Sequence, residues 1–215
     1  MKILERFNIK IDDEELLEEA LTHTSYVHEH PGTISYERLE YLGDAVLELV
    51  MSDYLYKNTL LPEGLMSKKR SEYVCEEALF EYAKELDLES HIRIGNGLAE
   101  PNRSIIADTF EAVLGAIYLT VGIEKVREIF NEIILPHVEN GTVFLSDYKS
   151  VLQELVQTEK GTIEYITVNE TGPAHNREFE VEVKVDGIIY GHGIGHSKKE
   201  AEQAAAKDAY SKRAE

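Results

Sequence analysis

The spacing of the apolar residues changes once along this chain, near residue 160, and that change limits the folds it can adopt. Before it, apolar residues recur every three or four positions, as in residues 39–50, which is typical of amphipathic helices. After it, apolar and charged residues alternate through 179–185, the period of a half-buried strand. The sequence therefore predicts a multidomain chain, with an all-α domain over residues 1–146 and a small α+β domain over residues 147–215.

The first domain is expected to consist of helices joined by short turns. The predicted helical stretches are residues 16–21 behind the acidic residues 12–15, then 36–57, 67–86, 105–119 and 124–134. Pro62-Glu63-Gly64 has turn chemistry and is expected to end the long second segment. Residues 136–147, with Pro136, Asn140 and Gly141, are expected to form a linker.

The second domain is expected to have the order α-β-β-β-α. Its predicted elements are a helix over 148–157, strands over 163–169, 179–185 and 188–194, and a final helix over 198–212. Asp186-Gly187 lies between the last two strands and predicts a tight hairpin. About 65 residues are enough for this arrangement.

Composition excludes several classes of protein. With 215 residues and 43% hydrophobic content the chain can build a core in each domain. Its longest charge-free apolar stretch, residues 112–123, is much shorter than the roughly 20 residues of a spanning helix, so no membrane segment is expected. The charged start, residues 1–6, does not resemble a secretory signal. Cys75 is the only cysteine, so we expect no disulfide, no disulfide-linked partner and a cytoplasmic location.

Acidic residues recur at helical spacing in two places. Glu37, Glu40 and Asp44 follow i, i+3 and i+7, which places them on one helix face, and Asp108 and Glu111 follow i and i+3 beside an apolar run. Two like charges about 4 Å apart repel by roughly 4 kcal/mol at an effective dielectric near 20, so these groups would need a cation to converge. Carboxylate oxygens favour Mg²⁺ or Mn²⁺ over Zn²⁺.

Spacing alone leaves other interpretations open. Acidic residues at helical spacing usually form a solvated face, and this chain has 41 Asp and Glu residues. Glu48 continues the stripe of Glu40 and Asp44 by four more residues, and spacing cannot exclude it as a ligand.

A longer pattern is more specific. The run Glu37-Arg38-Leu39-Glu40-Tyr41-Leu42-Gly43-Asp44-Ala45-Val46-Leu47 resembles the signature of the ribonuclease III family. Further matching pieces occur in the family's order at residues 20–26, 63–67 and 107–112. The C-terminal part resembles the family's double-stranded-RNA-binding domain at residues 147–154, 172–175 and 197–205. The resemblance covers nearly the whole chain and implies an all-α ribonuclease III endonuclease domain followed by an RNA-binding domain.

This resemblance assigns roles to the acidic residues. It implies that Glu40, Asp44, Asp108 and Glu111 bind Mg²⁺, which Mn²⁺ can replace, and that Glu48 does not. Asp44 and Glu111 would be the catalytic residues, with Glu111 essential for turnover because it holds the ion that activates the attacking water. Glu37 and Glu63 match accessory acidic positions that line the same valley.

The family works as a homodimer whose signature helices form the interface. The implied reaction is hydrolysis of phosphodiester bonds in double-stranded RNA, leaving 5′-phosphate and 3′-hydroxyl ends with a short 3′ overhang, and ribosomal RNA precursors are expected substrates. Two other functions stay open. One is a non-cleaving double-stranded-RNA-binding regulator, and the other is a metal phosphohydrolase that acts on small substrates.

The second domain carries the residues expected to bind RNA. These are Ser150, Gln153, Glu154 and Gln157 on the first helix, His175 in the loop with Pro173 and Ala174, and Lys198 and Lys199 at the start of the last helix. Such a domain reads the shape, 2′-hydroxyls and phosphates of A-form RNA. Taken alone, such a pair of lysines is usually an ordinary surface feature, and the strand pattern and the loop are what favour RNA binding.

The net charge of −19 conflicts with a polyanionic partner, because nucleic-acid binding depends on neutralised phosphates. Metal ions held in an acidic valley would reverse the local field that RNA meets. We therefore expect RNA binding to be weak, sensitive to salt and assisted by Mg²⁺.

Overall fold

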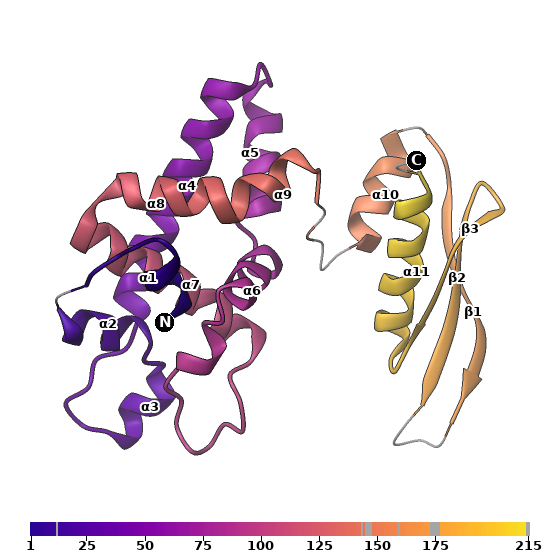
Figure 1. Cartoon of the computed structure of the whole chain (residues 1–215). Coiled ribbons are helices and arrows are strands. Elements are labelled where there is room, and N and C mark those ends of the chain that lie inside the picture. Colours follow the sequence, from indigo (N-terminus) through magenta and orange to yellow (C-terminus); the bar gives the residue numbers. More distant parts are fainter. Residues whose placement is uncertain (12, 143, 145–147, 159, 173–176, 214–215) are drawn as a thin grey trace. The chain divides into compact units, whose positions relative to one another are not determined.

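Two separate hydrophobic cores divide the chain into a helical unit, Met1–Phe144, and a smaller α-β-β-β-α unit, Leu145–Glu215 (Figure 1). The computed structural model describes residues 1–11, 13–142, 144, 148–158, 160–172 and 177–213. The predicted fold class, an all-α domain followed by an α-β-β-β-α domain, is confirmed.

The helical unit consists of short helices around two long ones. Its elements are α1 (Lys2–Arg6), α2 (Glu14–Ala20), α3 (Thr24–Glu29), α4 (Glu37–Asn58), α5 (Glu63–Tyr73), α6 (Glu76–Glu85), the 3₁₀ turn η1 (Glu89–His91), α7 (Arg103–Val121), α8 (Ile123–Ile129), the π-helical turn η2 (Phe130–Ile134) and α9 (Leu135–Glu139).

The centre of this unit is α7, which packs against both α4 and α6. The side chain of Asn102 accepts a hydrogen bond from the Ile105 amide at 3.0 Å and caps the start of α7. Gly122, with φ at 86°, ends it. Within the described residues only α7 is long and apolar enough to cross a membrane by length and composition, but most of its side chains are buried in the core of the helical unit.

Two glycines allow α4 and α7 to approach until their backbones touch. A Cβ atom at Gly43 would lie 1.8 Å from the carbonyl oxygen of Glu111. A Cβ atom at Gly115 would lie 2.4 Å from the carbonyl oxygen of Leu39. Any larger residue at either position must push the helices apart. This crossing places the acidic stripe of α4 directly beside that of α7.

The predicted single helix over 67–86 is wrong, because α5 ends at Tyr73 and α6 begins at Glu76. Cys75 has extended backbone angles (φ −77°, ψ 158°) and is the N-cap of α6. Apolar residues recur at helical spacing across the break, at Val74, Ala78, Tyr82 and Leu86, so the period of the sequence does not reveal it.

The predicted turn at residues 62–64 is also wrong, since Pro62 is the N-cap of α5 and the helix starts at Glu63. Proline and glycine are tolerated there because the first amide groups of a helix need no helical acceptor.

The predicted linker begins too early. Pro136 lies in the first turn of α9, which runs to Glu139. Phe144 is only 7% exposed, and its ring packs edge-on against Tyr82 with 5.4 Å between the ring centroids. Part of the supposed linker therefore belongs to the core of the helical unit.

The second unit is a three-stranded antiparallel sheet covered on one face by two helices (Figure 1). Its elements are α10 (Tyr148–Thr158), β1 (Ile163–Thr171), β2 (Glu178–Val185), β3 (Ile188–Gly195) and α11 (Lys198–Arg213), with strand order β1-β2-β3. The predicted hairpin is confirmed, because Val185 pairs with Ile188 and both Asp186 (φ 51°) and Gly187 (φ 81°) have the positive angles of a tight turn.

Gly43→Ala is predicted to destabilise the helical unit by about 2–3 kcal/mol, because the new methyl group meets backbone atoms that cannot move independently. Thermal unfolding of the full chain, followed by circular dichroism, measures this change. Gly64→Ala in α5 is the matched control, since a Cβ atom there meets nothing within 4 Å. Equal melting temperatures for the two variants would contradict the close-contact explanation.

Candidate active site

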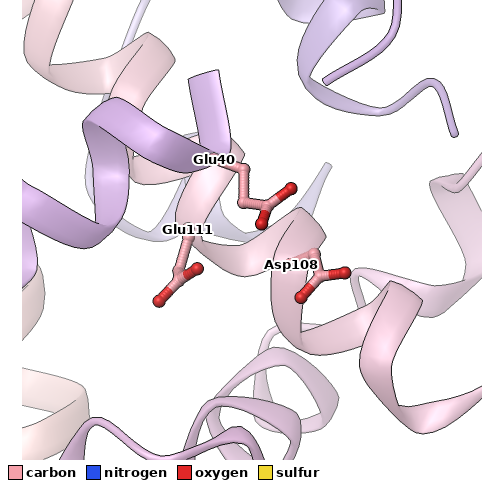
Figure 2. A group of neighbouring side chains, drawn as sticks. All are labelled: Glu40, Asp108 and Glu111. Atoms are coloured by element: carbon pink, nitrogen blue, oxygen red, sulfur yellow. The ribbon is translucent and has the colours of Figure 1, made fainter. Parts of the chain in front are cut away.

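Three carboxylates from two helices converge beside the crossing of α4 and α7. Glu40 projects from α4, and Asp108 and Glu111 project from α7 toward it (Figure 2). One oxygen atom from each residue lies within 4.8 Å of the other two. Glu111 is only 8% exposed, while Glu40 and Asp108 are partly buried. Such a group of hard oxygen atoms is suited to a divalent cation such as Mg²⁺ or Mn²⁺.

The surroundings of these acids oppose their ionisation in the absence of a cation. Burial, together with the negative charges of Asp44, Glu40 and Asp108, raises the pKa of Glu111 to about 8. Burial and the neighbouring charge of Asp108 raise the pKa of Glu40. Burial also raises the pKa of Asp108, although hydrogen bonds from Tyr36 and Ser104 act in the opposite direction. The arrangement is therefore electrostatically costly, and a bound cation would relieve it.

Asp44 lies one turn after Glu40 on α4 and is exposed. Its oxygens are outside the group of three, but its negative charge is the first among the neighbouring charges that raise the pKa of Glu111. Asp44 is therefore close enough to Glu111 to affect its ionisation, but the structure does not bring its carboxylate into the group of three.

Glu48 continues the α4 stripe, and its charge also raises the pKa of Glu111. It is paired with Arg70 of α5, with 3.7 Å between Oε1 and the guanidinium Nε. Arg70 in turn donates through Nη1 to the hydroxyl of Ser52 at 3.1 Å. Arg70 thus partly neutralises Glu48, which helical spacing alone could not exclude as a metal ligand.

The two accessory acids lie farther out. Glu37 is exposed at the start of α4, accepts a hydrogen bond from Ser35 at 3.0 Å, and contributes to the raised pKa of Glu40. Glu63 is exposed at the start of α5 and accepts a hydrogen bond from Ser67 at 3.1 Å. It lines a cavity of about 210 Å³ between α4 and α5 rather than the group of three carboxylates.

The groups that contact Asp108 are not predicted from the sequence. The hydroxyls of Tyr36 and Ser104 donate to its Oδ2 at 3.4 and 3.5 Å. Ser104 could have been found at i−4 on the same helix face. Tyr36 directly precedes the acidic stripe, but nothing in its spacing reveals a contact with a residue 72 positions away.

In the second unit the structure places Ser150, Gln153 and Gln157 on the exposed side of α10, at i, i+3 and i+7. Glu154 belongs to the same helix, but its side chain lies outside the described part of the chain, as does the whole of His175 with Pro173 and Ala174.

Lys198 and Lys199 are exposed in the first turn of α11. The Lys198 ammonium lies 5.9 Å from the centroid of the Phe179 ring. Both residues belong to the first turn of a 16-residue helix, whose positive end favours anions.

Both units match known protein families. Residues 13–138 match the family described as Ribonuclease-III-like, and residues 148–213 match the double-stranded RNA binding motif. The chain is 44% identical to Ribonuclease 3 of Onion yellows phytoplasma over 214 residues, covering 98% of this chain and 90% of that protein. It is 48% identical to Ribonuclease 3 of Streptococcus equi subsp. zooepidemicus, covering 94% and 92% respectively.

A solved structure agrees with these matches. The nuclease domain of ribonuclease III from Campylobacter jejuni, described as structurally flexible in a region involved in dimer formation, is similar with a TM-score of 0.56 and 35% identity, covering 63% of this chain and 95% of that chain. This chain belongs to the ribonuclease III family, and it combines that family's endonuclease domain with a double-stranded-RNA-binding domain.

Without divalent cations, the folded protein is predicted to become less stable as the pH rises. The pKa of Glu111 is about 8 in the folded protein and near 4.5 when unfolded, so the folded state holds the proton more tightly. This contribution is complete below pH 4.5 and is lost as pH rises through 8. Melting temperatures in EDTA between pH 6 and 8.5 measure it, and Glu111→Gln should flatten the decline. An equal slope in both proteins would contradict the prediction.

Proposed function

We propose that this ribonuclease III hydrolyses phosphodiester bonds in double-stranded RNA with Mg²⁺ held by Glu40, Asp44, Asp108 and Glu111, and that Mn²⁺ can replace Mg²⁺. The observation that carries this proposal is the convergence of three buried or partly buried carboxylates from α4 and α7 in a chain that also has an RNA-binding unit. A bound divalent ion of this kind lowers the pKa of a water molecule and neutralises negative charge on a phosphate.

The residues of the site have different tasks. Glu111 is the most buried of the three carboxylates, so its side chain would be the least mobile of the residues that hold the ion. Glu40 and Asp108 would hold the same ion, and Asp44, which is exposed one turn after Glu40, would complete the set of ligands on the side open to RNA. Asp44 and Glu111 are the catalytic residues in this proposal, and Glu37 and Glu63 are accessory acids that contact substrate or partner.

The second unit, proposed to span residues 147–215, would hold the duplex. Ser150, Gln153, Glu154 and Gln157 would contact 2′-hydroxyls in one minor groove, His175 the next minor groove, and Lys198 with Lys199 the phosphates between them. Support comes from the exposed polar face of α10 and the exposed lysines at the start of α11. This mode reads shape more than base sequence, so structured precursors of ribosomal and messenger RNA in the cytoplasm are the proposed substrates.

Cleavage by this proposal leaves 5′-phosphate and 3′-hydroxyl ends with a short 3′ overhang, because two sites in a homodimer cut opposite strands.

Exposed apolar side chains on α4 and α7 are the evidence that supports the proposed homodimer. Tyr41 (81% exposed) and Leu49 (57%) project from α4, and Leu119 (55%) projects from the end of α7. A cavity of about 370 Å³ between Leu49 and Tyr118 lies in the same region. A projecting ring and a hollow on one surface suit a two-fold interface. A native mass of one chain at micromolar concentration would contradict it.

A non-cleaving regulator remains the alternative function. Burying repelling acids lowers stability and would give no advantage to a protein that only binds RNA, so the α4–α7 cluster favours the enzyme.

Glu111→Gln is predicted to lower cleavage of a long RNA duplex in Mg²⁺ by about 100-fold or more while RNA binding survives, because the variant keeps the side chain's size and loses its charge. Product gels measure cleavage, and gel-shift titration measures binding. Glu14→Gln, an exposed acid in the first turn of α2, is the matched control. A DNA duplex of the same sequence should resist cleavage. Binding without cleavage by the native chain would support the regulator instead.

A further inference from the structure

Residues 20–26 match the family pattern but have no role in the proposed function, and two of them, Thr22 and His23, contact Tyr36 at the start of α4. The Tyr36 amide donates to the carbonyl oxygen of Thr22 at 2.9 Å. The His23 ring lies beside the Tyr36 ring, with 5.8 Å between the ring centroids. Thr22 is itself buried, and its hydroxyl donates to the carbonyl oxygen of Glu18 at 2.6 Å. Tyr36 is therefore fixed by an element that belongs to neither α4 nor α7.

The segment that contacts Tyr36 is itself held in place by a short strand-like pairing. Thr22 and Arg93 form an isolated parallel bridge, in which the Arg93 amide donates to Leu21 at 2.8 Å and the His23 amide donates to Arg93 at 3.0 Å. Arg93 also forms an ion pair with Glu18 at 2.7 Å. Two segments about 70 residues apart in the sequence thus stabilise the position of Tyr36.

Tyr36 connects the two helices that supply the carboxylates. Its carbonyl oxygen accepts the amide of Glu40 at 2.9 Å, which fixes the backbone of the α4 ligand. Its hydroxyl donates to Oδ2 of Asp108 at 3.4 Å, and Ser104 donates to the same oxygen at 3.5 Å. Because both donors approach Oδ2, the other oxygen of Asp108 can turn toward an ion. Tyr36 is only 2% exposed, so water cannot readily replace its hydroxyl.

We propose that Tyr36 is a positioning residue that, together with Ser104, orients Asp108 and sets its spacing from Glu40 in the metal site. This inference rests on the proposed metal-dependent function. A hydrogen-bonded partner behind a metal-binding carboxylate fixes its orientation, and removal of such a partner typically weakens metal binding by about 10–100-fold. Tyr36 acts through Asp108 and does not itself touch RNA in this proposal.

The test is Mn²⁺ binding by the full chain without RNA, measured from the free Mn²⁺ signal in electron paramagnetic resonance. Tyr36→Phe keeps the ring and removes the hydroxyl, and we expect its Mn²⁺ dissociation constant to rise about 10-fold. The Mn²⁺ concentration for half-maximal RNA cleavage should rise in parallel, while kcat at saturating Mn²⁺ and KM for RNA stay close to the native values.

Tyr82→Phe is the matched control, because Tyr82 is also fully buried, packs against α7 at Phe110, and loses one hydroxyl that donates to the Tyr73 carbonyl at 3.2 Å. It should lower the melting temperature in EDTA about as much as Tyr36→Phe does and leave Mn²⁺ binding unchanged. Equal Mn²⁺ dissociation constants in the two variants would overturn the positioning role.

Ser104→Ala provides a second variant in case Tyr36→Phe does not fold, because Ser104 is only partly buried in the first turn of α7. A rise of several-fold in its Mn²⁺ dissociation constant would support the proposal, and a native value would overturn it. The behaviour of the native protein distinguishes a failure of the proposed function from a failure of the positioning role of Tyr36. Native protein that neither binds Mn²⁺ nor cleaves RNA would refute the proposed function itself, whereas normal native behaviour with unaffected variants refutes the positioning role alone.

Discussion

The rest of the site depends on the backbone contact between α4 and α7. Gly43 and Gly115 remove the side chains that would separate these helices, so that the carbonyl of Glu111 lies against one glycine and the carbonyl of Leu39 against the other. At this separation a carboxylate from α4 and two from α7 can point at one centre. With a wider crossing the same acids would form two solvated stripes, which is their usual behaviour on helices. The glycine of the signature is therefore as necessary to the site as its acids.

Without a bound metal ion, the carboxylates of the site lower the stability of the folded protein. Most of α7 is apolar and buried, yet it holds Glu111 at its centre, where burial and neighbouring acids favour the protonated form. The hydroxyls of Tyr36 and Ser104, and the ion pair of Glu48 with Arg70, partly compensate for this repulsion. A bound cation would complete this compensation, and it would also reverse the local field for RNA in a chain whose net charge is −19.

The sequence predicts the two-unit architecture because its apolar spacing changes from the helical to the strand period, and Asp186-Gly187 predicts the hairpin because few residues adopt two successive positive φ angles. It does not reveal the break at Val74–Cys75, since the amphipathic period runs through it. The acids Glu40, Asp108 and Glu111 were predicted as ligands from their resemblance to the family, and the structure brings these three together. Tyr36 could not be predicted, because its contacts with Thr22 and Asp108 depend on tertiary packing.

The central claim is that the crossing of α4 and α7 creates a divalent cation site. The most direct measurement is the anomalous scattering of Mn²⁺ in crystals of the full chain. Our account predicts an anomalous peak within coordination distance, about 2.0–2.3 Å, of oxygens from Glu40, Asp108 and Glu111. A fully occupied peak elsewhere, with these carboxylates empty of metal at millimolar Mn²⁺, would contradict it.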